Sequence, residues 1–424
     1  MTQRQAYLLV GAAAVLPRLA VLLHERGAIL SAYTEKSEDF ARTFVSSGTF
    51  GFVPGEPSAW TQPLYSFFLI PIYWIFGRSW LAVGLVQIAV AAATAALVFE
   101  IGRRVVSRKV GLLAAIAATL NPYVIWHDVH VNREILDELL AAAIVLLVLL
   151  AAGSRRRLAT VALLGVVLGL TILGNARLVL LPLVVAGFLL WQTRAWRESI
   201  ALVGVCVLTL MPWAIRNQVS VGCFTLTTDT RALWKANNAE TYATLAAGKW
   251  IDDVPRPTGA PYTPEEAQTL YQRDGRRVHV DECAQMRLYR NKVLVFWRDH
   301  PGEKAKLAGQ AARMLWDPRA LKTEGRAEAG GAVDTIRTWV QPLYMIPLYA
   351  LGLLGLLLLP RRAAVLIVLL LAYQTLAAVA FAGVTRYRVP WDFALALSAA
   401  AALFWLADRV PGPLRRPRLS TGKT

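Results

Sequence analysis

Long apolar runs separated by short polar stretches are the dominant pattern along this chain. Residues 80–101 and 339–359 are each apolar over about 20 positions. A helix of that length crosses a hydrocarbon core of about 30 Å. Strands of a membrane barrel would instead alternate polar and apolar positions over roughly ten residues, and these runs do not. The sequence therefore predicts an all-α polytopic membrane protein.

The apolar pattern predicts about ten transmembrane helices with juxtamembrane helices and one large loop between them. A shorter apolar segment, residues 63–77, begins at a proline and is rich in aromatic side chains, which is typical of a helix lying at the membrane interface. Residues 301–316 place their apolar side chains on one helical face and predict a surface helix. The expected spans are residues 6–24, 80–102, 110–126, 135–153, 158–174, 177–192, 198–214, 338–359, 363–382 and 391–408.

The net charge of +17 in a chain of 424 residues is concentrated in short connections between the predicted spans. Basic clusters occur at residues 103–109, 155–157, 194–197 and 361–362, and in the tail after residue 414. Cytoplasmic loops carry such an excess of Lys and Arg, so one topology with both termini in the cytoplasm satisfies every cluster. Topology and attraction to anionic membrane lipids account for the charge without nucleic acid as a partner. We therefore expect a multi-pass protein of a bacterial-type inner membrane.

This topology divides the chain into three parts. Residues 1–215 form an N-terminal transmembrane module whose first external loop is residues 25–79. Residues 216–337 form a large external, periplasmic loop, and residues 338–424 form the last helices and a basic cytoplasmic tail. Cys223 and Cys283 both fall in the large loop, where an oxidising compartment would permit a disulfide, but the sequence leaves their pairing open.

An acidic cluster follows the first predicted span directly. Glu35, Glu38 and Asp39 lie there in a chain of which only 17% is charged. Ser37 is expected to cap a short helix that ends at Gly48. The first interpretation is a catalytic site. The second is that Glu38 and Asp39 merely stabilise the positive end of the helix.

The second external turn contains His127, His130 and Glu134. Their spacing of i, i+3 and i+7 would place them on one helical face, with ligand types that suit a divalent metal. The alternative interpretation is ordinary capping and hydrogen bonding at the interface. The sequence leaves the choice, and so the cofactor, open.

Arginines occur on the external side as well, where the charge pattern does not require them. Arg177 follows Asn175 between two predicted spans, and Arg386 and Arg388 lie in the last external turn. A guanidinium group grips phosphate through two parallel hydrogen bonds. For Arg177, extension of the side chain to the nearby interface is the competing interpretation.

Carboxylates facing arginines at an outer membrane surface suit one reaction type. The arginines would stabilise charge on a departing lipid phosphate, while a carboxylate accepts the proton of the attacking hydroxyl or amine. The chain contains no P-loop and no Gly-rich dinucleotide fingerprint, so it offers no support for a nucleotide-driven process.

Several short motifs, taken in order, resemble the GT-C integral membrane glycosyltransferases. The likeness is to the protein-mannosyltransferase-like branch, family 39, which includes the lipid A aminoarabinose transferase, and it spans most of the chain. The motifs are Leu16-Pro17-Arg18, Gln62-Pro63-Leu64-Tyr65, Asn121-Pro122-Tyr123, Pro212-Trp213-Ala214, Leu233-Trp234-Lys235 and Arg386-Tyr387-Arg388-Val389-Pro390.

The resemblance implies a polyprenyl-phosphate-linked sugar donor and an inverting transfer on the non-cytoplasmic face. The acceptor would be a protein, a lipid or a glycan, and family members differ in metal use. Glu35 lies closest to the family's acidic position, Glu38-Asp39 is the nearest acidic pair, and Glu134 matches the acidic residue of the second external loop. The expected catalytic residues are therefore Glu35, Glu38, Asp39 and Glu134, and the expected substrate-binding residues are Arg177, Arg386, Arg388, Tyr65 and Lys235.

Two other functions remain as alternatives. A non-catalytic transporter or flippase of lipid-linked glycans would commonly show paired internal repeats with broken helices at the midplane. The second half of this sequence does not resemble the first. A surface polysaccharide ligase or polymerase would depend on the arginines rather than on the carboxylates.

Overall fold

The computed structural model describes residues 2–31, 35–153, 157–257, 259–319 and 335–409, and within them the chain is almost entirely helical. Extended pairing in this part of the chain is limited to one isolated bridge between Val53 and Glu56. The predicted all-α fold is confirmed. Arg155, Arg156 and the basic tail lie outside the described residues.

Among the described residues, nine helices are long and apolar enough to cross a membrane, so the multi-pass membrane class is confirmed. Most of them match an expected span within a few residues. The nine helices are α1 (Gln3–Glu25) with its 3-10 extension, α4 (Trp80–Val105), α7 (Glu134–Gly153), α8 (Arg157–Gly174), α9 (Leu181–Thr193) with the preceding turn, α10 (Trp196–Ser220), α17 (Gln341–Leu356) with the turn before it, α18 (Arg361–Ala380), and α20 (Asp392–Arg409) with the short helices before it.

The remaining expected span, residues 110–126, consists of two shorter helices, α5 (Arg108–Thr119) and α6 (Pro122–His127). The Asn121 side chain accepts a hydrogen bond from the Tyr123 amide at 3.1 Å and so caps α6. Pro122 begins α6 because it has no N–H to donate to a preceding turn. The sequence therefore breaks the helix at this point.

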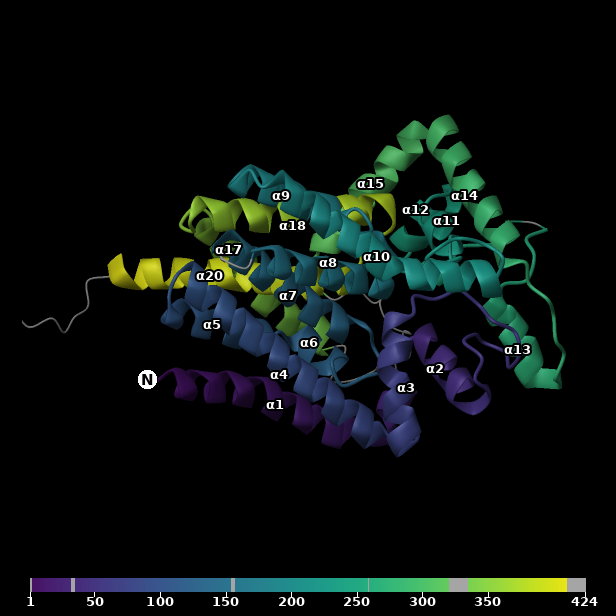
Figure 1. Cartoon of the computed structure of the whole chain (residues 1–424), viewed down its shortest axis with the longest axis horizontal. Helices are drawn as coiled ribbons and strands as arrows, with labels where there is room; N and C mark the ends of the chain where they lie inside the picture. The colour runs from purple at the N-terminus through teal and green to yellow at the C-terminus, as the bar shows by residue number, and fades with distance from the viewer. Residues whose placement is uncertain (1, 32–34, 154–156, 258, 320–334, 410–424) are drawn as a thin grey trace, which may run out of the picture.

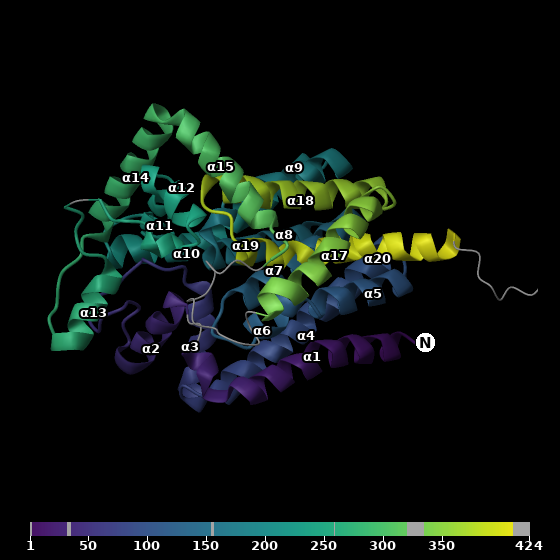
Figure 2. The ribbon, with the colours of Figure 1, turned by 180° about the vertical axis from the view of Figure 1, so that it is seen from behind.

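The long helices run side by side along the longest dimension of the molecule (Figures 1 and 2). The start of α1 and the end of α20 lie at one end of the bundle. The helices of the first loop and of the large loop lie at the opposite end, which we call the loop end. These are α2 (Lys36–Ser47), α3 (Leu64–Phe76), α11 (Arg231–Lys235), α12 (Ala239–Ala246), α13 (Pro264–Asp274) and α14 (Glu282–Asp299).

The helix α3 is too short to span a membrane and runs across the direction of the long helices in both views. It exposes Trp74, Ile75 and Phe76, while Tyr65 and Leu69 face the interior. This arrangement agrees with the interfacial helix expected for residues 63–77.

Close helix crossings hold the bundle together. A Cβ added to Gly355 in α17 would lie 1.8 Å from the carbonyl oxygen of Ser398 in α20, so the two backbones meet where only glycine fits. The amphipathic helix α15 (Pro301–Trp316) packs in the same way, because a Cβ on Gly383 would lie 1.6 Å from the Ala311 oxygen. The predicted surface helix is therefore docked on the bundle beside α18.

The large loop is tied to its surroundings by a disulfide between Cys223 and Cys283, whose Cα atoms are 5.9 Å apart. The pairing that the sequence left open is thus present. The preceding helix α10 continues to Ser220, past the predicted boundary at residue 215. The proposed division into three parts otherwise stays a prediction.

Candidate functional site

One arginine at the loop end joins two carboxylates from distant parts of the chain. The Arg386 guanidinium donates through Nη2 to Glu35 and through Nε to Glu134 Oε1, the latter at 2.6 Å. All three side chains are largely buried, with exposed fractions of 11% for Arg386, 13% for Glu35 and 3% for Glu134. The first loop, the second turn and the last turn therefore meet at one point.

Local structure brings each of these residues to the meeting point. Glu35 is the N-cap residue of α2, and its backbone N–H donates to the Val131 carbonyl at 3.2 Å. Glu134 is the first residue of α7, and Arg386 lies in the single turn of α19 (Thr385–Arg388). The expectation that Ser37 caps α2 is wrong, because the helix begins at Lys36, two residues earlier than a Ser37 cap would place it, and the Ser37 hydroxyl lies 3.3 Å from that of Thr61.

Arg133 adds a second cation beside this group. Its Nη1 donates to Gln62 Oε1 at 3.0 Å, and its Nε lies 3.8 Å from Glu134 Oε1. We call Glu35, Arg133, Glu134 and Arg386 the carboxylate–arginine cluster. Burial raises the pKa of Glu35, but the charges of Arg386 and Arg133 outweigh it and hold this pKa below its usual value. Glu35 is therefore ionised at neutral pH.

The cluster also contains unused hydrogen-bonding capacity. The Glu134 Oε2 atom is buried and has no hydrogen-bond partner within the described part of the chain. A buried carboxylate oxygen left in this state is costly unless a further group or water approaches it. The geometry therefore suits a polar ligand at this position.

Arg177 lies next to the cluster. Its Cζ atom is 2.9 Å from the centre of the Tyr387 ring, and its Nε donates to Asn175 Oδ1 at 3.1 Å. The Asn175 amide in turn donates to Asp137 Oδ2 at 3.1 Å. Arg177 is thus held against the residue that follows Arg386.

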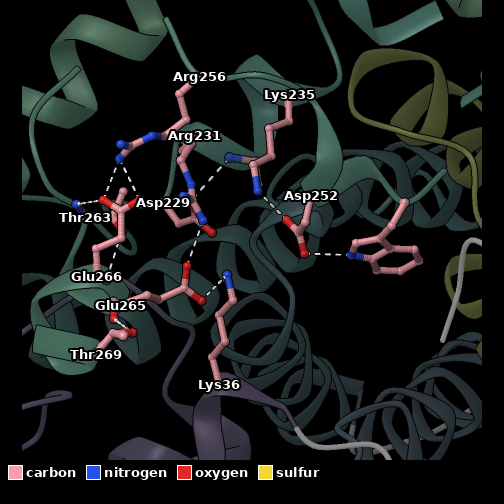
Figure 3. Close-up of polar contacts among 12 residues, drawn as sticks. Lys36, Asp229, Arg231, Lys235, Asp252, Arg256, Thr263, Glu265, Glu266 and Thr269 are labelled. Carbon is pink, nitrogen blue, oxygen red and sulfur yellow. Dashed lines mark hydrogen bonds and ion pairs between the residues drawn. The ribbon is translucent and has the colours of Figure 1, made fainter. Parts of the chain in front are cut away.

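A second set of ion pairs, shown in Figure 3, connects the first loop to the large loop. Glu265 in α13 pairs with Lys36 at 2.5 Å and with Arg231 in α11 at 2.7 Å. The Lys235 ammonium group pairs with Asp252, which the indole of Trp250 also contacts at 2.6 Å. Because Lys36 directly follows Glu35, the large loop is fastened to the backbone that presents the catalytic candidate.

In this second set, the charge of Lys235 is neutralised by its ion pair with Asp252. Burial lowers the pKa of Lys235, and the Lys235 ammonium group holds the pKa of Asp252 at about 2. Lys235, a predicted substrate-binding residue, is largely buried and is already paired with a carboxylate. It is not one of the residues of the carboxylate–arginine cluster. A phosphate group could take the place of that carboxylate.

Two predicted catalytic residues lie outside the cluster. Glu38 is buried and accepts hydrogen bonds from the Tyr73 hydroxyl at 2.8 Å and from Arg78 Nε at 2.6 Å, which fastens α2 to α3 and to the segment after it. Asp39 remains 31% exposed and lies 3.6 Å from Arg42. Burial raises the pKa of Asp39. Of the three predicted catalytic carboxylates of the first loop, Glu35 is therefore the one that contacts Arg386.

Two predicted substrate-binding residues are engaged elsewhere in the fold. The Tyr65 hydroxyl donates to Gln87 Oε1 at 2.6 Å, and Gln87 donates to the carbonyls of Asp128 and His130. Arg388 is completely buried, pairs with Asp392 at 3.1 Å and donates to the Leu315 carbonyl at 2.7 Å. Both side chains hold protein segments together, because their polar atoms face partners from neighbouring elements.

The three candidate metal ligands do not form a helical face. His127 ends α6 and Glu134 begins α7, so a turn replaces the continuous helix that their spacing assumed. His127 stacks on Tyr123, and His130 Nδ1 lies 2.7 Å from the Trp126 carbonyl oxygen. The residues that the structure describes include no group of three or more His, Cys, Asp or Glu placed to hold a metal ion.

Sequence reasoning missed Arg133, Gln62 and Asp137. Arg133 could have been predicted as a functional residue from the sequence, because it directly precedes Glu134 and is an ionisable residue at a membrane boundary. Gln62 was identified only as part of a motif. The burial of Asp137 one turn into α7 depends on its contact with Asn175, which lies 38 residues away in the sequence.

Comparison with known proteins supports the expected family resemblance. The model of the dolichyl-phosphate-mannose-protein mannosyltransferase family matches residues 57–215. This segment includes Gln62, Arg133, Glu134 and Arg177. No curated protein matches the chain significantly in sequence.

Among solved structures, the fold is similar to that of the oligosaccharyltransferase of Archaeoglobus fulgidus. The form tethered to an acceptor peptide matches with a TM-score of 0.55 at 12% identity, over 96% of this chain and 50% of the other. The form with an inhibitory peptide and a dolichol-phosphate matches with a TM-score of 0.52 at 13% identity, over 95% and 50%. This chain thus spans about half the length of that enzyme.

A further similar structure is ArnT from Cupriavidus metallidurans bound to undecaprenyl phosphate, with a TM-score of 0.44 at 14% identity, over 93% of this chain and 79% of the other. Together, the family match and the fold confirm the predicted resemblance to the GT-C membrane glycosyltransferases.

Proposed function

We propose that this chain, which has the GT-C fold, is a membrane glycosyltransferase that uses a sugar linked to a polyprenyl phosphate. The observation that carries the proposal is the placement of Arg386 between Glu35 and Glu134 at the loop end. A carboxylate and a guanidinium group in contact are what transfer from a phosphate leaving group requires. The dolichol-phosphate in the oligosaccharyltransferase structure supports a donor of this kind.

In the proposed reaction, the acceptor hydroxyl or amine attacks the anomeric carbon as the bond from that carbon to the phosphate oxygen breaks. Attack opposite the leaving group inverts the configuration. Glu35 takes the proton from the acceptor and later releases it to water. The electron pair of the broken bond stays on the phosphate, whose negative charge Arg386 stabilises with Arg133 and Arg177 nearby.

The ion pair between Arg386 and Glu35 fits this scheme through an exchange of partners. While Arg386 contacts Glu35, the carboxylate is stabilised in its charged form and is a weak base. A donor phosphate that draws Arg386 away would remove this stabilisation, and the pKa of the buried Glu35 carboxyl would rise. Binding of the donor would then activate the base.

The charge pattern supports the proposed placement of the cluster outside the cytoplasm. The loop end lies opposite the start of α1 and the end of α20 (Figure 1). The basic connections at residues 103–109 and 361–362 lie at the ends of α4 and α18 that are remote from the loop end. With those connections in the cytoplasm, the cluster faces the periplasm or the cell exterior.

The test is mass spectrometry of glycolipids, glycoproteins and surface glycans from a deletion strain. The strain is compared after complementation with the wild-type chain, with Glu35→Gln, and with Glu266→Gln as a matched control on an exposed ion pair. We expect one glycosylated product to disappear on deletion, to return with wild type and Glu266→Gln, and to stay absent with Glu35→Gln. Identical products in all four strains would refute the proposed transferase.

A further inference from the structure

The disulfide between Cys223 and Cys283 lies beside a buried carboxylate that holds the first loop. Cys283 is in the first turn of α14, near the end of α10 at the loop end (Figure 1), and the residue before it is Glu282. Glu282 is only 5% exposed. Its Oε2 atom accepts hydrogen bonds from the Ala59 amide at 3.0 Å and from the Thr228 hydroxyl at 2.5 Å. One side chain beside the disulfide therefore connects α14 to the first loop.

Glu282 occupies this position without a cation in contact. Within the described residues its carboxylate accepts hydrogen bonds but forms no ion pair. Burial of a charged carboxylate without a paired cation is costly, because the group loses its hydration. Burial raises the pKa of Glu282 in spite of its hydrogen bonds. The charged side chain is therefore more stable in water, and it stays buried because the chain around it is held in place.

A pocket at the loop end gives Glu282 space to move. The pocket encloses about 640 Å³, open solvent included, and both Glu282 and Val221 line it. Val221 lies two positions before Cys223. Since Glu282 directly precedes Cys283, residues near both cysteines line the pocket. A small shift of the start of α14 would move the carboxylate from Ala59 into this space, and the disulfide opposes that shift because it ties α14 to the segment after α10.

The first loop links Ala59 to the carboxylate–arginine cluster. Gln62 lies three positions after Ala59, and its Oε1 atom accepts from Arg133 at 3.0 Å. Three residues of extended chain cover at most about 11 Å, so displacement of Ala59 disturbs the contact of Gln62 with Arg133. The loop stays attached at a second point, because Arg216 Nη1 donates to the Ser58 carbonyl at 2.8 Å. Loss of the contact with α14 would therefore loosen the cluster without unfolding the loop.

We propose that the disulfide between Cys223 and Cys283 is a redox switch for the carboxylate–arginine cluster. A dithiol of the external compartment would reduce it by thiol–disulfide exchange. The sulfur–sulfur bond breaks, two electrons and two protons pass from the dithiol to the two cysteines, and the dithiol becomes a disulfide. The reverse exchange with an oxidised partner of the same chemical class restores the bond.

Reduction frees the start of α14 from the segment after α10. Glu282 then turns into the pocket, where water hydrates its carboxylate, and the Ala59 amide loses its acceptor. Gln62 and Arg133 lose their fixed position, so stabilisation of the departing phosphate weakens. This last step rests on the proposed glycosyltransferase function, whereas the release of Glu282 does not.

Hydrogen–deuterium exchange of the full chain in detergent, before and after reduction with dithiothreitol, tests the release of Glu282. Alkylation of the two freed thiols confirms the reduction. Exchange of the Ala59 amide should rise about tenfold, because the amide loses a hydrogen bond to a charged acceptor. Exchange in α12, which the contact does not involve, should stay unchanged. An equal rise in α12 would show that the disulfide supports the whole large loop, and would overturn the switch.

Variants separate the effect of the buried charge from that of the disulfide alone. Glu282→Gln keeps the shape and an acceptor oxygen but removes the cost of burying a charge, so reduction should change Ala59 exchange by less than about twofold. A tenfold rise in reduced Glu282→Gln would contradict the assigned role of the charge. Cys223→Ser combined with Cys283→Ser should show the fast exchange without reductant. Cys206→Ala, which removes the free buried cysteine of α10, should respond to dithiothreitol as wild type does.

The rate at which purified protein forms the product identified with the deletion strain gives an independent readout. Reduction should lower this rate about tenfold in wild type and leave Glu282→Gln within about twofold. Absence of transfer by the oxidised wild type would refute the proposed function, while exchange at Ala59 would still decide the switch. Unchanged exchange at Ala59 after complete reduction, or resistance of the native disulfide to dithiothreitol, overturns the switch and leaves the transferase untouched.

Discussion

Arg386 contacts Glu35 across 351 positions of the sequence, and this single ion pair joins the first loop to the last turn of the protein. Glu35 is fixed by the start of α2, and Arg386 by the turn that precedes α20. The contact places the two residues on the same side of the bundle. The two groups that the proposed mechanism requires, a carboxylate as base and an arginine for the phosphate, are therefore in direct contact.

The first prediction concerns the base. Glu35→Gln removes the proton acceptor while keeping the shape of the side chain, so transfer should fall about 10²- to 10⁴-fold. Asp39→Asn should retain activity within a few-fold, because Asp39 lies beside Arg42 and away from Arg386. Transfer by purified protein measures both. Near-normal activity in Glu35→Gln with loss in Asp39→Asn would reverse the assignment.

The second prediction concerns Arg388, whose guanidinium group is buried against Asp392. Arg388→Gln should lower the free energy of unfolding by about 3–5 kcal/mol, since the Asp392 carboxylate is left without its cation. The double variant Arg388→Gln, Asp392→Asn should recover most of the lost thermal stability. A stable Arg388→Gln protein that fails only to bind donor would restore the phosphate role expected from the sequence.

The third prediction concerns the link between the loops shown in Figure 3. Glu265→Gln weakens the pairs with Lys36 and Arg231, each expected to contribute about 0.2–1 kcal/mol at this exposure, so stability should change little. Transfer should fall about tenfold, because the backbone that positions Glu35 loosens. Glu266→Gln on the same helix is the control. Indistinguishable rates in the two variants would show that the link does not position the site.

The fourth prediction concerns pH and Lys304. Its ammonium group donates to Asn237 Oδ1 and to the Val379 carbonyl, both at 2.6 Å, and burial lowers its pKa to about 8. In the unfolded chain the Lys304 pKa is near 10.5, so between pH 8 and pH 10.5 unfolding of the protein takes up a proton at this residue. The contribution of Lys304 to the free energy of unfolding therefore rises with pH over this range. The Tm of wild type minus that of Lys304→Met should therefore increase from pH 8 to pH 10. A constant or falling difference would contradict the assigned burial.

The fifth prediction concerns the docking of α15. Gly383→Ala would place a Cβ against the Ala311 carbonyl, and overpacking of this kind should cost about 1–3 kcal/mol. Gly309→Ala lies on the exposed side of α15 with open space around it, so it should gain up to about 1 kcal/mol from helix propensity. Thermal unfolding of the two variants compares them. A stable Gly383→Ala protein would mean that α15 is not packed on residues 381–384 as described.

The sequence by itself determined the fold class and most of the membrane spans, because apolar length and the placement of Arg and Lys depend only on local composition. It also indicated the resemblance that the family match and the fold support. Asn121 and Pro122, which break the expected third span, are equally visible in the sequence, since both act on their own helix.

Only the tertiary structure decided which charged residues meet. Glu35 and Glu38 lie three positions apart, yet one pairs with Arg386 and the other with Arg78, because Glu35 has an extended backbone before α2 and Glu38 lies within the helix. Arg386 and Arg388 likewise separate, one toward the cluster and one into the bundle. The residue type determines the charge of a side chain, but its ion-pair partner depends on contacts between elements that can be hundreds of residues apart in the sequence.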